Sequence, residues 1–340
     1  MVDIKSMYKP EVISFMEEMG EKKFRATQLF EWMHKKRAAS FDDMTNLSLS
    51  LRETLKEKAT LDTLEKVQVL ESKTDGTRKY LFKASDGALI ESVMMRYSYG
   101  VSLCVSSQVG CAMGCSFCAS TVNGLDRNLT AGEILEQVYG VERDSGERVS
   151  HVVVMGMGEP FANYENLIRF LRLITDPEAG GLGARNITVS TCGIVPGILR
   201  FAEEKIPVTL ALSLHASDQA ERERIMPVAR KYPLPEVLSA CDEYFNKTGR
   251  RVTYEYALID GVNDTDEDAR RMGELLGGKN CHVNLIPVNP VDGKEYRPGN
   301  ASRFKNKLEN YRINATIRRA LGGDIDGACG QLRNRNSGRD

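Results

Sequence analysis

The sequence lacks the segments that would carry a chain into or across a membrane. No apolar run in its 340 residues approaches the roughly 18 residues that a spanning helix needs. The first residues, MVDIKSMYKPEV, lack the apolar core of a signal peptide. We therefore expect a cytoplasmic protein that makes no membrane contact.

A surplus of charge of either sign is also missing. The chain has 46 Lys and Arg against 47 Asp and Glu, which gives a net charge of −1 at pH 7. No overall field would attract nucleic acid, so any such contact must come from local basic clusters. Each of these basic clusters, taken alone, is also compatible with an ordinary solvent-exposed surface of the protein. The clusters are Lys22, Lys23 and Arg25; Lys35, Lys36 and Arg37; Arg250 and Arg251; Arg318 and Arg319; and Arg333 and Arg335.

Internal repeats and low-complexity segments are absent from the sequence. The composition is that of a globular protein, with 41% hydrophobic and 27% charged residues, and the length allows one large domain and a smaller one. Eight cysteines in a chain expected in the cytoplasm favour metal or thiol chemistry over a disulfide framework.

The first 60 residues have the period of helices. Pro10 begins an amphipathic run that ends at Gly20, a second run covers 25–37, and a third covers about 50–58. Residues 65–96 change to the pattern of a small antiparallel meander, with Asp-Gly turns at 75–76 and 86–87. We predict a helical domain over 1–60 and a small β extension over 61–98.

From about residue 100, short apolar strands alternate with helices. One helix is predicted to begin after Thr130, which forms a capping box with Glu133. Continuous apolar strands separated by helices predict a parallel sheet with the helices outside it. About six such units predict an α/β fold with a partial barrel over 99–333, followed by a flexible tail over 334–340. The strands are expected at 102–107, 151–156, 186–191, 208–214, 252–258 and 282–287.

Three cysteines follow the first of these strands, in the stretch 111-CAMGCSFCAS-120. Cys111, Cys115 and Cys118 have the spacing C-x3-C-x2-C, and nearby glycines allow the tight loop that would turn their sulfurs inward. Thiolates suit zinc or iron–sulfur clusters. No second Cys/His pair follows at zinc-finger spacing, whereas three cysteines on a [4Fe–4S] cluster would leave one iron open to a ligand. A zinc site completed by a distant residue, or three unliganded core thiols, are the alternatives.

This spacing resembles that of the radical S-adenosylmethionine (SAM) superfamily. There the amino and carboxylate groups of SAM chelate the open iron, and an electron from the cluster cleaves SAM to a 5′-deoxyadenosyl radical. The stretch 155-MGMGEP-160 resembles the superfamily's motif for the SAM amino group. The resemblance implies that Glu159 accepts from an ammonium, while Gly156 and Gly158 let the backbone approach closely.

Several segments together resemble the RlmN/Cfr family of radical SAM methyltransferases, and the resemblance covers nearly the whole chain. The resemblance implies methylation of an adenosine in 23S ribosomal RNA, and of adenosine 37 in some transfer RNAs. It also implies two SAM molecules per turnover, a flavodoxin-type electron donor and a monomer. The Pro after Glu159 and the stretch IRRALGGDID resemble RlmN, which methylates C2, more than Cfr, which methylates C8. The segments are CVSSQVGCAMGCSFCAS at 104–120, MGMGEP, SLH at 213–215, VNLIPVNP at 283–290 and DIDGACGQL at 324–332.

The resemblance implies three catalytic residues. Cys329 would carry the methyl group as S-methylcysteine and, after hydrogen abstraction, add it to the adenine. Cys104 would attack the resulting thioether and release the product as a disulfide with Cys329. Glu91 would accept the C2 proton, although a strand glutamate in a salt bridge is the simpler reading of that residue alone.

The same resemblance implies a set of SAM contacts at the carboxyl ends of strands, where barrel enzymes place ligands. On sequence alone His215 is more often a structural histidine, which a backbone contact to SAM would still allow. Cys192 departs from the family pattern, and we interpret it as a core thiol near the SAM site. The implied contacts are Gly158, Glu159, Ser190, Ser213, Leu214, His215 and Asn289.

Two other functions fit part of the sequence. Cfr-like methylation at C8, which would confer antibiotic resistance, uses the same machinery on the same adenosine. A zinc-stabilised RNA-binding protein without catalysis would also use the cysteines and basic clusters. In each case, the helical domain over 1–60 is the part expected to hold RNA.

Overall fold

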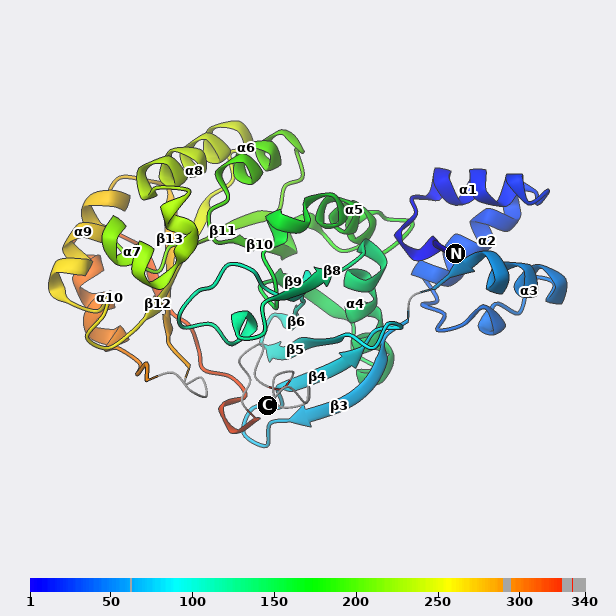
Figure 1. The fold of residues 1–340 in the computed structure, drawn as a ribbon, viewed down its shortest axis with the longest axis horizontal. Helices are drawn as coiled ribbons and strands as arrows, with labels where there is room; N and C mark the ends of the chain where they lie inside the picture. The colour runs from blue at the N-terminus through cyan, green and yellow to red at the C-terminus, as the bar shows by residue number, and fades with distance from the viewer. Residues whose placement is uncertain (62, 290–294, 326–331, 333–340) are drawn as a thin grey trace.

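The computed structural model describes residues 1–61, 63–289, 295–325 and 332 (Figure 1). The helices expected near the N-terminus are present as α1 (Lys9–Glu18), α2 (Lys23–His34) and α3 (Leu49–Lys58). They bury one face each, including Met16, Leu29 and Leu55. Helical spacing of apolar residues thus predicted this part correctly.

Ten of the described strands form one mixed sheet, and the other described strands form two short two-stranded sheets. The predicted parallel series is confirmed: six strands pair in parallel in sequence order, and β14 adds a seventh. The meander is also present, with Gly76 and Gly87 at positive φ in its turns. In sheet order the strands are β14 (Ala315–Ile317), β13 (Cys281–Pro287), β12 (Val252–Leu258), β11 (Thr209–Ser213), β10 (Ile187–Thr191), β9 (Val149–Val154), β6 (Gly100–Cys104), β5 (Leu89–Tyr97), β4 (Arg78–Lys83) and β3 (Glu65–Glu71).

Helices cover the outer face of this curved sheet (Figure 1). The predicted capping box is present at the start of α4, where Thr130 Oγ1 accepts from the Glu133 N–H and the Glu133 carboxylate accepts from the Thr130 N–H. The result is the predicted α/β partial barrel. The helices are α4 (Ala131–Ser145), α5 (Tyr164–Thr175), α6 (Val195–Glu203), α7 (Gln219–Ile225), α8 (Leu234–Thr248), α9 (Asp266–Leu276) and α10 (Ala301–Glu309).

The meander is joined to the barrel through β5, which pairs antiparallel with β6, while β6 pairs in parallel with β9. Val93, Cys104, Val153 and Thr188 are successive partners across these strands. Directly opposed residues project to the same face, so this row lies on the inner face of the barrel, away from the helices. The β extension therefore enlarges the inner face.

The N-terminal helices contact the barrel through the helix layer. Lys5, just before α1, forms a fully buried ion pair with Glu136 of α4. Ser6 Oγ accepts a hydrogen bond from the Gly132 N–H at the start of the same helix, 2.6 Å away. Among the described residues, no helix combines the length and the apolar character needed to cross a bilayer.

Replacing Lys5 with Met should lower the free energy of unfolding by about 3 kcal/mol, because it leaves the Glu136 carboxylate buried without this cation. Glu136 keeps Arg143 as a partner, so the cost should not exceed this range. The matched control is Lys9→Met, because Lys9 pairs with the exposed Glu178 and such pairs contribute about 1 kcal/mol or less. Urea unfolding at neutral pH measures both, and equal losses in the two variants would contradict the prediction.

Candidate functional site

The cysteine loop begins where β7 (Gln108–Gly110) ends and is packed against α7 and the turn that follows it. Gly110 and Gly114 have positive φ, as the tight loop requires. Met113, Cys115 and Phe117 pack against Ile225 and Met226. The Ser116 N–H also donates to the Ile225 carbonyl at 2.9 Å. The loop is therefore held by contacts along its length.

The three cysteines of this loop lie close enough to affect one another. Burial, with a smaller contribution from Cys118, raises the pKa of the Cys111 thiol to about 11. Burial and the other two cysteines also raise the pKa of Cys115. Such thiols become ligands when a metal replaces their protons.

The donor set, three thiols on one loop, fits an iron–sulfur cluster. Among the described residues, no three His, Cys, Asp or Glu side chains converge on one point as ligands of a single ion. The cysteines of a cubane cluster need no such convergence, because each binds a different iron. We therefore expect Cys111, Cys115 and Cys118 to hold a [4Fe–4S] cluster.

The stretch after β9 crosses the strand that leads to the cysteine loop. Gly158 has φ +104°, and a Cβ built there would lie 2.6 Å from the Gln108 Cβ. The Gln108 Oε1 accepts from the Glu159 N–H at 2.8 Å. Only glycine allows this crossing, which brings Glu159 beside the cysteine loop.

The Glu159 carboxylate is buried and already accepts several hydrogen bonds from the chain. Its donors are Thr191 Oγ1 at 2.8 Å, the Cys192 N–H at 2.7 Å and the Phe161 N–H at 3.0 Å. Burial raises the pKa of Glu159, and these donors oppose that effect. The Cys192 thiol also hydrogen-bonds to this carboxylate, so a SAM ammonium would have to share an oxygen with one of these donors or replace it. Cys192 is buried in the wall of this site, as expected of a core thiol.

Polar side chains line the inner face beyond Glu159. Ser190 Oγ and Ser213 Oγ lie 3.4 Å apart on neighbouring strands. Glu255, the strand partner of Ser213, accepts from Asn284 Nδ2 at 2.8 Å. Burial raises the pKa of Glu255, and the hydrogen bond from Asn284 opposes this. Buried polar groups are stable only with hydrogen-bond partners, which these groups find in one another, and we expect a ligand to bind at this polar face.

His215 has a structural role in this site. Its Nδ1 accepts from the Ala257 N–H at 2.8 Å, and the Phe117 ring of the cysteine loop packs edge-on against it. Burial, with the nearby Arg222, lowers the pKa of His215 to about 3, so the ring is neutral. The imidazole thus connects the cysteine loop to β12, and Leu214 beside it is fully buried.

Sequence reasoning missed Arg222, which is fully buried behind the site. Its guanidinium donates to the carbonyls of Leu214, Cys192 and Ser213 at 3.1, 2.7 and 3.3 Å. Among the described atoms, its Nη1 is buried without a hydrogen-bond partner. In the sequence it sits in QAERERI, which reads as an exposed charged helix, so no local signal distinguishes it.

The structure brings two of the three expected catalytic residues to one face. Cys104 is buried on the inner face, and Glu91 lies on the same face of the adjoining strand. Cys329 lies outside the described residues. The segment that leads to it is anchored at the β3–β4 turn, where the Gly322 N–H donates to Asp75 at 2.9 Å and the Lys73 N–H donates to Asp324 at 3.0 Å.

Asn289 stands apart from the other expected SAM contacts. It follows β13 and is exposed, next to residues that the structure does not describe. Its position at the carboxyl end of a barrel strand agrees with the expected edge of the sheet.

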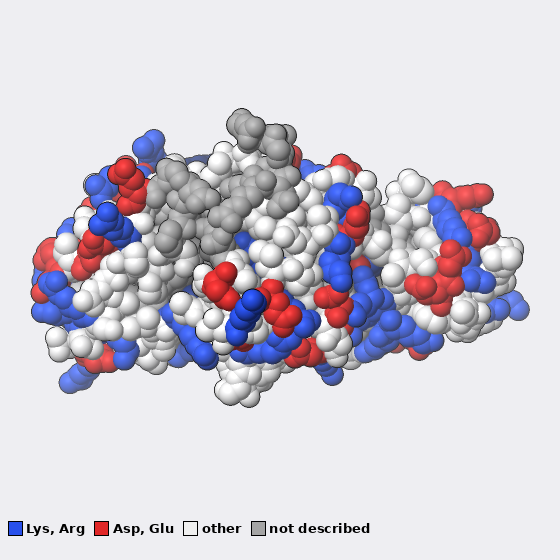
Figure 2. Space-filling model, turned by 90° about the horizontal axis from the view of Figure 1, so that it is seen from below, with Lys and Arg blue, Asp and Glu red and all other residues white. Residues whose placement is uncertain are grey.

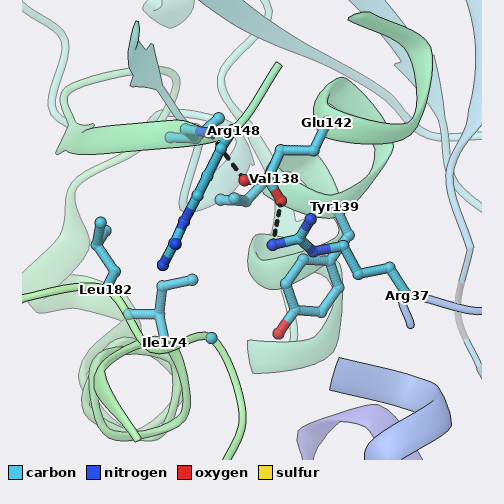
Figure 3. A pocket seen from close by; sticks show the side chains of 9 residues that line it. Arg37, Val138, Tyr139, Glu142, Arg148, Ile174 and Leu182 are labelled. Atoms are coloured by element: carbon cyan, nitrogen blue, oxygen red, sulfur yellow. Dashed lines mark hydrogen bonds and ion pairs between the residues drawn. The ribbon is translucent and has the colours of Figure 1, made fainter. Parts of the chain in front are cut away.

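A small cavity elsewhere is not part of this site. It lies between the end of α2 and the helices α4 and α5, where the Arg37 guanidinium points toward Glu142 beside the Tyr139 ring (Figure 3). Its lining includes apolar side chains such as Ile174 and Leu182. The cavity is a packing gap where the N-terminal helices meet the barrel.

A partial barrel with this cysteine loop after its first parallel strand defines a radical SAM enzyme. Consistent with this, the model of the radical SAM superfamily matches residues 105–273. A crystal structure of a radical SAM methyltransferase from Sphaerobacter thermophilus has a TM-score of 0.93 and 43% identity, covering 97% of this chain and 99% of that one.

Comparison with curated sequences identifies the family. A model described as the ribosomal RNA large subunit methyltransferase N-terminal domain matches residues 2–61. Proteins from Lachnospira eligens and Lachnoclostridium phytofermentans are 53% and 54% identical, each over 98% of this chain and over 97% and 94% of their own lengths. Both are named probable dual-specificity RNA methyltransferase RlmN. The chain belongs to the RlmN family of radical SAM RNA methyltransferases.

Membership of this family implies a [4Fe–4S] cluster and SAM as cofactors. It also contradicts the alternative of a non-catalytic zinc-stabilised protein, because the family consists of enzymes.

Replacing Gly158 with Ala should weaken SAM binding at least about tenfold, because the added Cβ would push Gln108 and Glu159 apart; a tenfold change corresponds to about 1.4 kcal/mol. Gly249→Ala is the control, since Gly249 also has a positive φ but has no atom within 4 Å of the built Cβ. Equilibrium dialysis of SAM with the cluster-loaded proteins measures the effect. Unchanged binding in Gly158→Ala would show that this crossing does not shape the SAM site.

Proposed function

We propose that this enzyme methylates C2 of an adenosine in 23S ribosomal RNA, and of adenosine 37 in some transfer RNAs, through an S-methylcysteine at Cys329. The relatives' name, dual-specificity RNA methyltransferase, supports more than one RNA substrate. The observation that carries the proposal is the position of Cys104 and Glu91 on the inner face of the sheet whose carboxyl edge bears the cysteine loop.

The chemistry of the target carbon supports a radical route. C2 of adenine is electron-poor, so it is a weak nucleophile toward the methyl group of SAM. When bound, the cluster and two SAM molecules supply the methyl group and the hydrogen-abstracting radical. The residues of the chain have to bind, orient and move protons around that chemistry.

Each proposed role follows the placement of the residue. Glu159 would bind the SAM ammonium by sharing an oxygen with one of its present donors or replacing it, with Ser190 and Ser213 beside it on the inner face. Glu91 would take the proton from C2, and the electron pair of the C–H bond would stay on the ring. The unpaired electron of the adduct would pass to the iron–sulfur cluster, the electron acceptor that the cofactor set supplies. The Cys104 thiolate would then attack the sulfur of Cys329, so that one S–S bond forms as the bond between Cys329 and the transferred carbon breaks. That carbon would leave with the electron pair of the broken bond and take up a proton to become the methyl group.

We propose that residues 1–60 form the domain that holds RNA, with 61–98 as a β extension and 99–333 as the catalytic core. Two cation–aromatic pairs, on α2 and just beyond its end, support this. Lys36 lies over the Trp32 ring at 3.9 Å, and Arg25 lies over the exposed Phe24 ring at 4.9 Å. Cations bind phosphates and aromatic rings stack on bases.

Because the net charge of the chain is only −1, local clusters of basic residues would have to attract the RNA. Figure 2 shows acidic and basic side chains interspersed over the visible face of the molecule, including the projecting N-terminal helices. Other basic residues are already paired, such as Arg37, which contacts Glu142 at 2.8 Å. We further propose a cytoplasmic monomer that takes electrons from a flavodoxin-type donor.

The product decides the position of methylation. RNA modified by the wild-type protein in a host strain that lacks its own enzyme should contain 2-methyladenosine, measured by mass spectrometry of the nucleosides. Appearance of 8-methyladenosine alone would contradict the proposal and favour the Cfr-like reaction. Ribosomal and transfer RNA fractions, analysed separately, report the two substrates.

Replacing Cys104 with Ala should stop turnover and leave a covalent protein–RNA adduct, because no thiol remains to release the product from Cys329. A slow-migrating, RNase-sensitive band on a denaturing gel measures the adduct. Cys241→Ala is the matched control, since Cys241 is a buried thiol of α8 in the outer hydrophobic core. The double variant Cys104→Ala/Cys329→Ala should give no adduct, and an adduct there would contradict the role of Cys329.

A further inference from the structure

A buried ion pair lies on the inner face beside Cys104. The Lys79 Nζ of β4 is 3.1 Å from the Glu91 Oε2 of β5, and both side chains are fully buried. In the strand register, Lys79 is opposite Val93, which is opposite Cys104 on its other side. The ammonium, the carboxylate and the thiol therefore occupy adjacent positions on one face.

Stability does not explain this pair. Removing two charges from water costs several kcal/mol per ion, and replacing a buried pair with apolar residues is often neutral or stabilising. The Lys5–Glu136 pair at least joins two parts of the molecule, whereas Lys79 and Glu91 lie on adjacent strands that already share backbone hydrogen bonds. A buried pair without a structural task points to a chemical one.

The nearest other charged groups on this face, among the described residues of β3 and β4, are Lys83, which is opposite Leu89, and its partner Glu65, and this pair is exposed. On β3, Leu70 is opposite Lys79 and Gln68 is opposite Leu81. The C-terminal segment contributes Leu321, and β6 contributes the Cys104 thiol. Among the described residues, the Lys79 ammonium contacts the Glu91 carboxylate directly.

We propose that Lys79 is a positioning residue whose buried ammonium orients the Glu91 carboxylate as the base for the C2 proton. The inference rests on the proposed function, in which that proton passes to Glu91. A carboxylate buried without a cation tends to take up a proton, and a neutral acid cannot accept another. The Ser106 Oγ–H donates to the Glu91 carbonyl at 2.7 Å, which fixes the backbone from which the carboxylate projects.

The test is the pH profile of methyl transfer to RNA in single turnovers by cluster-loaded enzyme. In Lys79→Met the acid limb should move to higher pH, so the rate in that limb falls about tenfold for each unit of displacement. Raising the pH should restore most of the rate, and Lys79→Arg should keep the wild-type profile. Lys83→Met is the matched control on the same strand, because Lys83 forms an exposed pair with Glu65.

Two further measurements separate positioning from general damage. Methylation of Cys329 from the first SAM, read by peptide mass spectrometry, should be unchanged in Lys79→Met because it needs no base at Glu91. Adding Lys79→Met to Glu91→Gln should cause no further loss of rate, since the two residues act as a unit. If Lys79→Met does not fold, Lys79→Gln provides the same comparison.

The outcomes distinguish the two proposals. A uniform loss at every pH, or a wild-type profile in Lys79→Met or Lys79→Gln, would overturn the role of Lys79 while leaving C2 methylation intact. If the wild-type product is 8-methyladenosine, the proposed function fails, and the same profile measured on that product decides the role of Lys79. A cluster-loaded wild type that methylates no adenosine would overturn both.

Discussion

The register of β6 between β5 and β9 is the constraint on which the site depends. β6 is antiparallel to one neighbour and parallel to the other, and it ends at Cys104 just before the turn into the cysteine loop. A slip of one residue would send every side chain of the strand to the opposite face. Cys104 would then point into the helix layer, away from Glu91.

The two faces of the sheet are built from different chemistry because of this register. The outer face presents Leu103, Val152 and Val189 to the helices, which bury them completely. The inner face carries polar groups from neighbouring strands, such as Ser213 and Glu255. Apolar contact stabilises the outer face and does not depend on the direction of each side chain. The inner face is stable only when its polar groups have hydrogen-bond partners.

Sequence periodicity predicted the helices, the meander and the order of the parallel strands, because these follow from the spacing of apolar residues. Thr130 and Glu133 predicted a helix start because a capping box is local. The cysteine loop and the glycine of MGMGEP were predictable for the same reason: their geometry is set within a few residues.

The rest of the site depends on which strands meet, and a local pattern does not contain that information. Arg222 sits in a short helix that reads as solvated, yet its helix packs behind the cysteine loop and buries it. Lys79 stands between Arg78 and Tyr80 in a strand with charged ends, and only the pairing of β4 with β5 brings it to Glu91. The position of Cys329 relative to Cys104 stays a prediction.

Among the described residues, β14 and β3 are the two edge strands of the sheet, and each has a feature that opposes pairing with another chain. β14 spans three residues at one edge, too short to present a long row of unpaired backbone groups. At the other edge, β3 carries Glu65, which pairs with Lys83 at 2.6 Å, and Glu71, which pairs with Arg78 at 3.1 Å. A foreign strand adding there would have to dehydrate these charges, so the gap in the barrel is protected against closure by another chain.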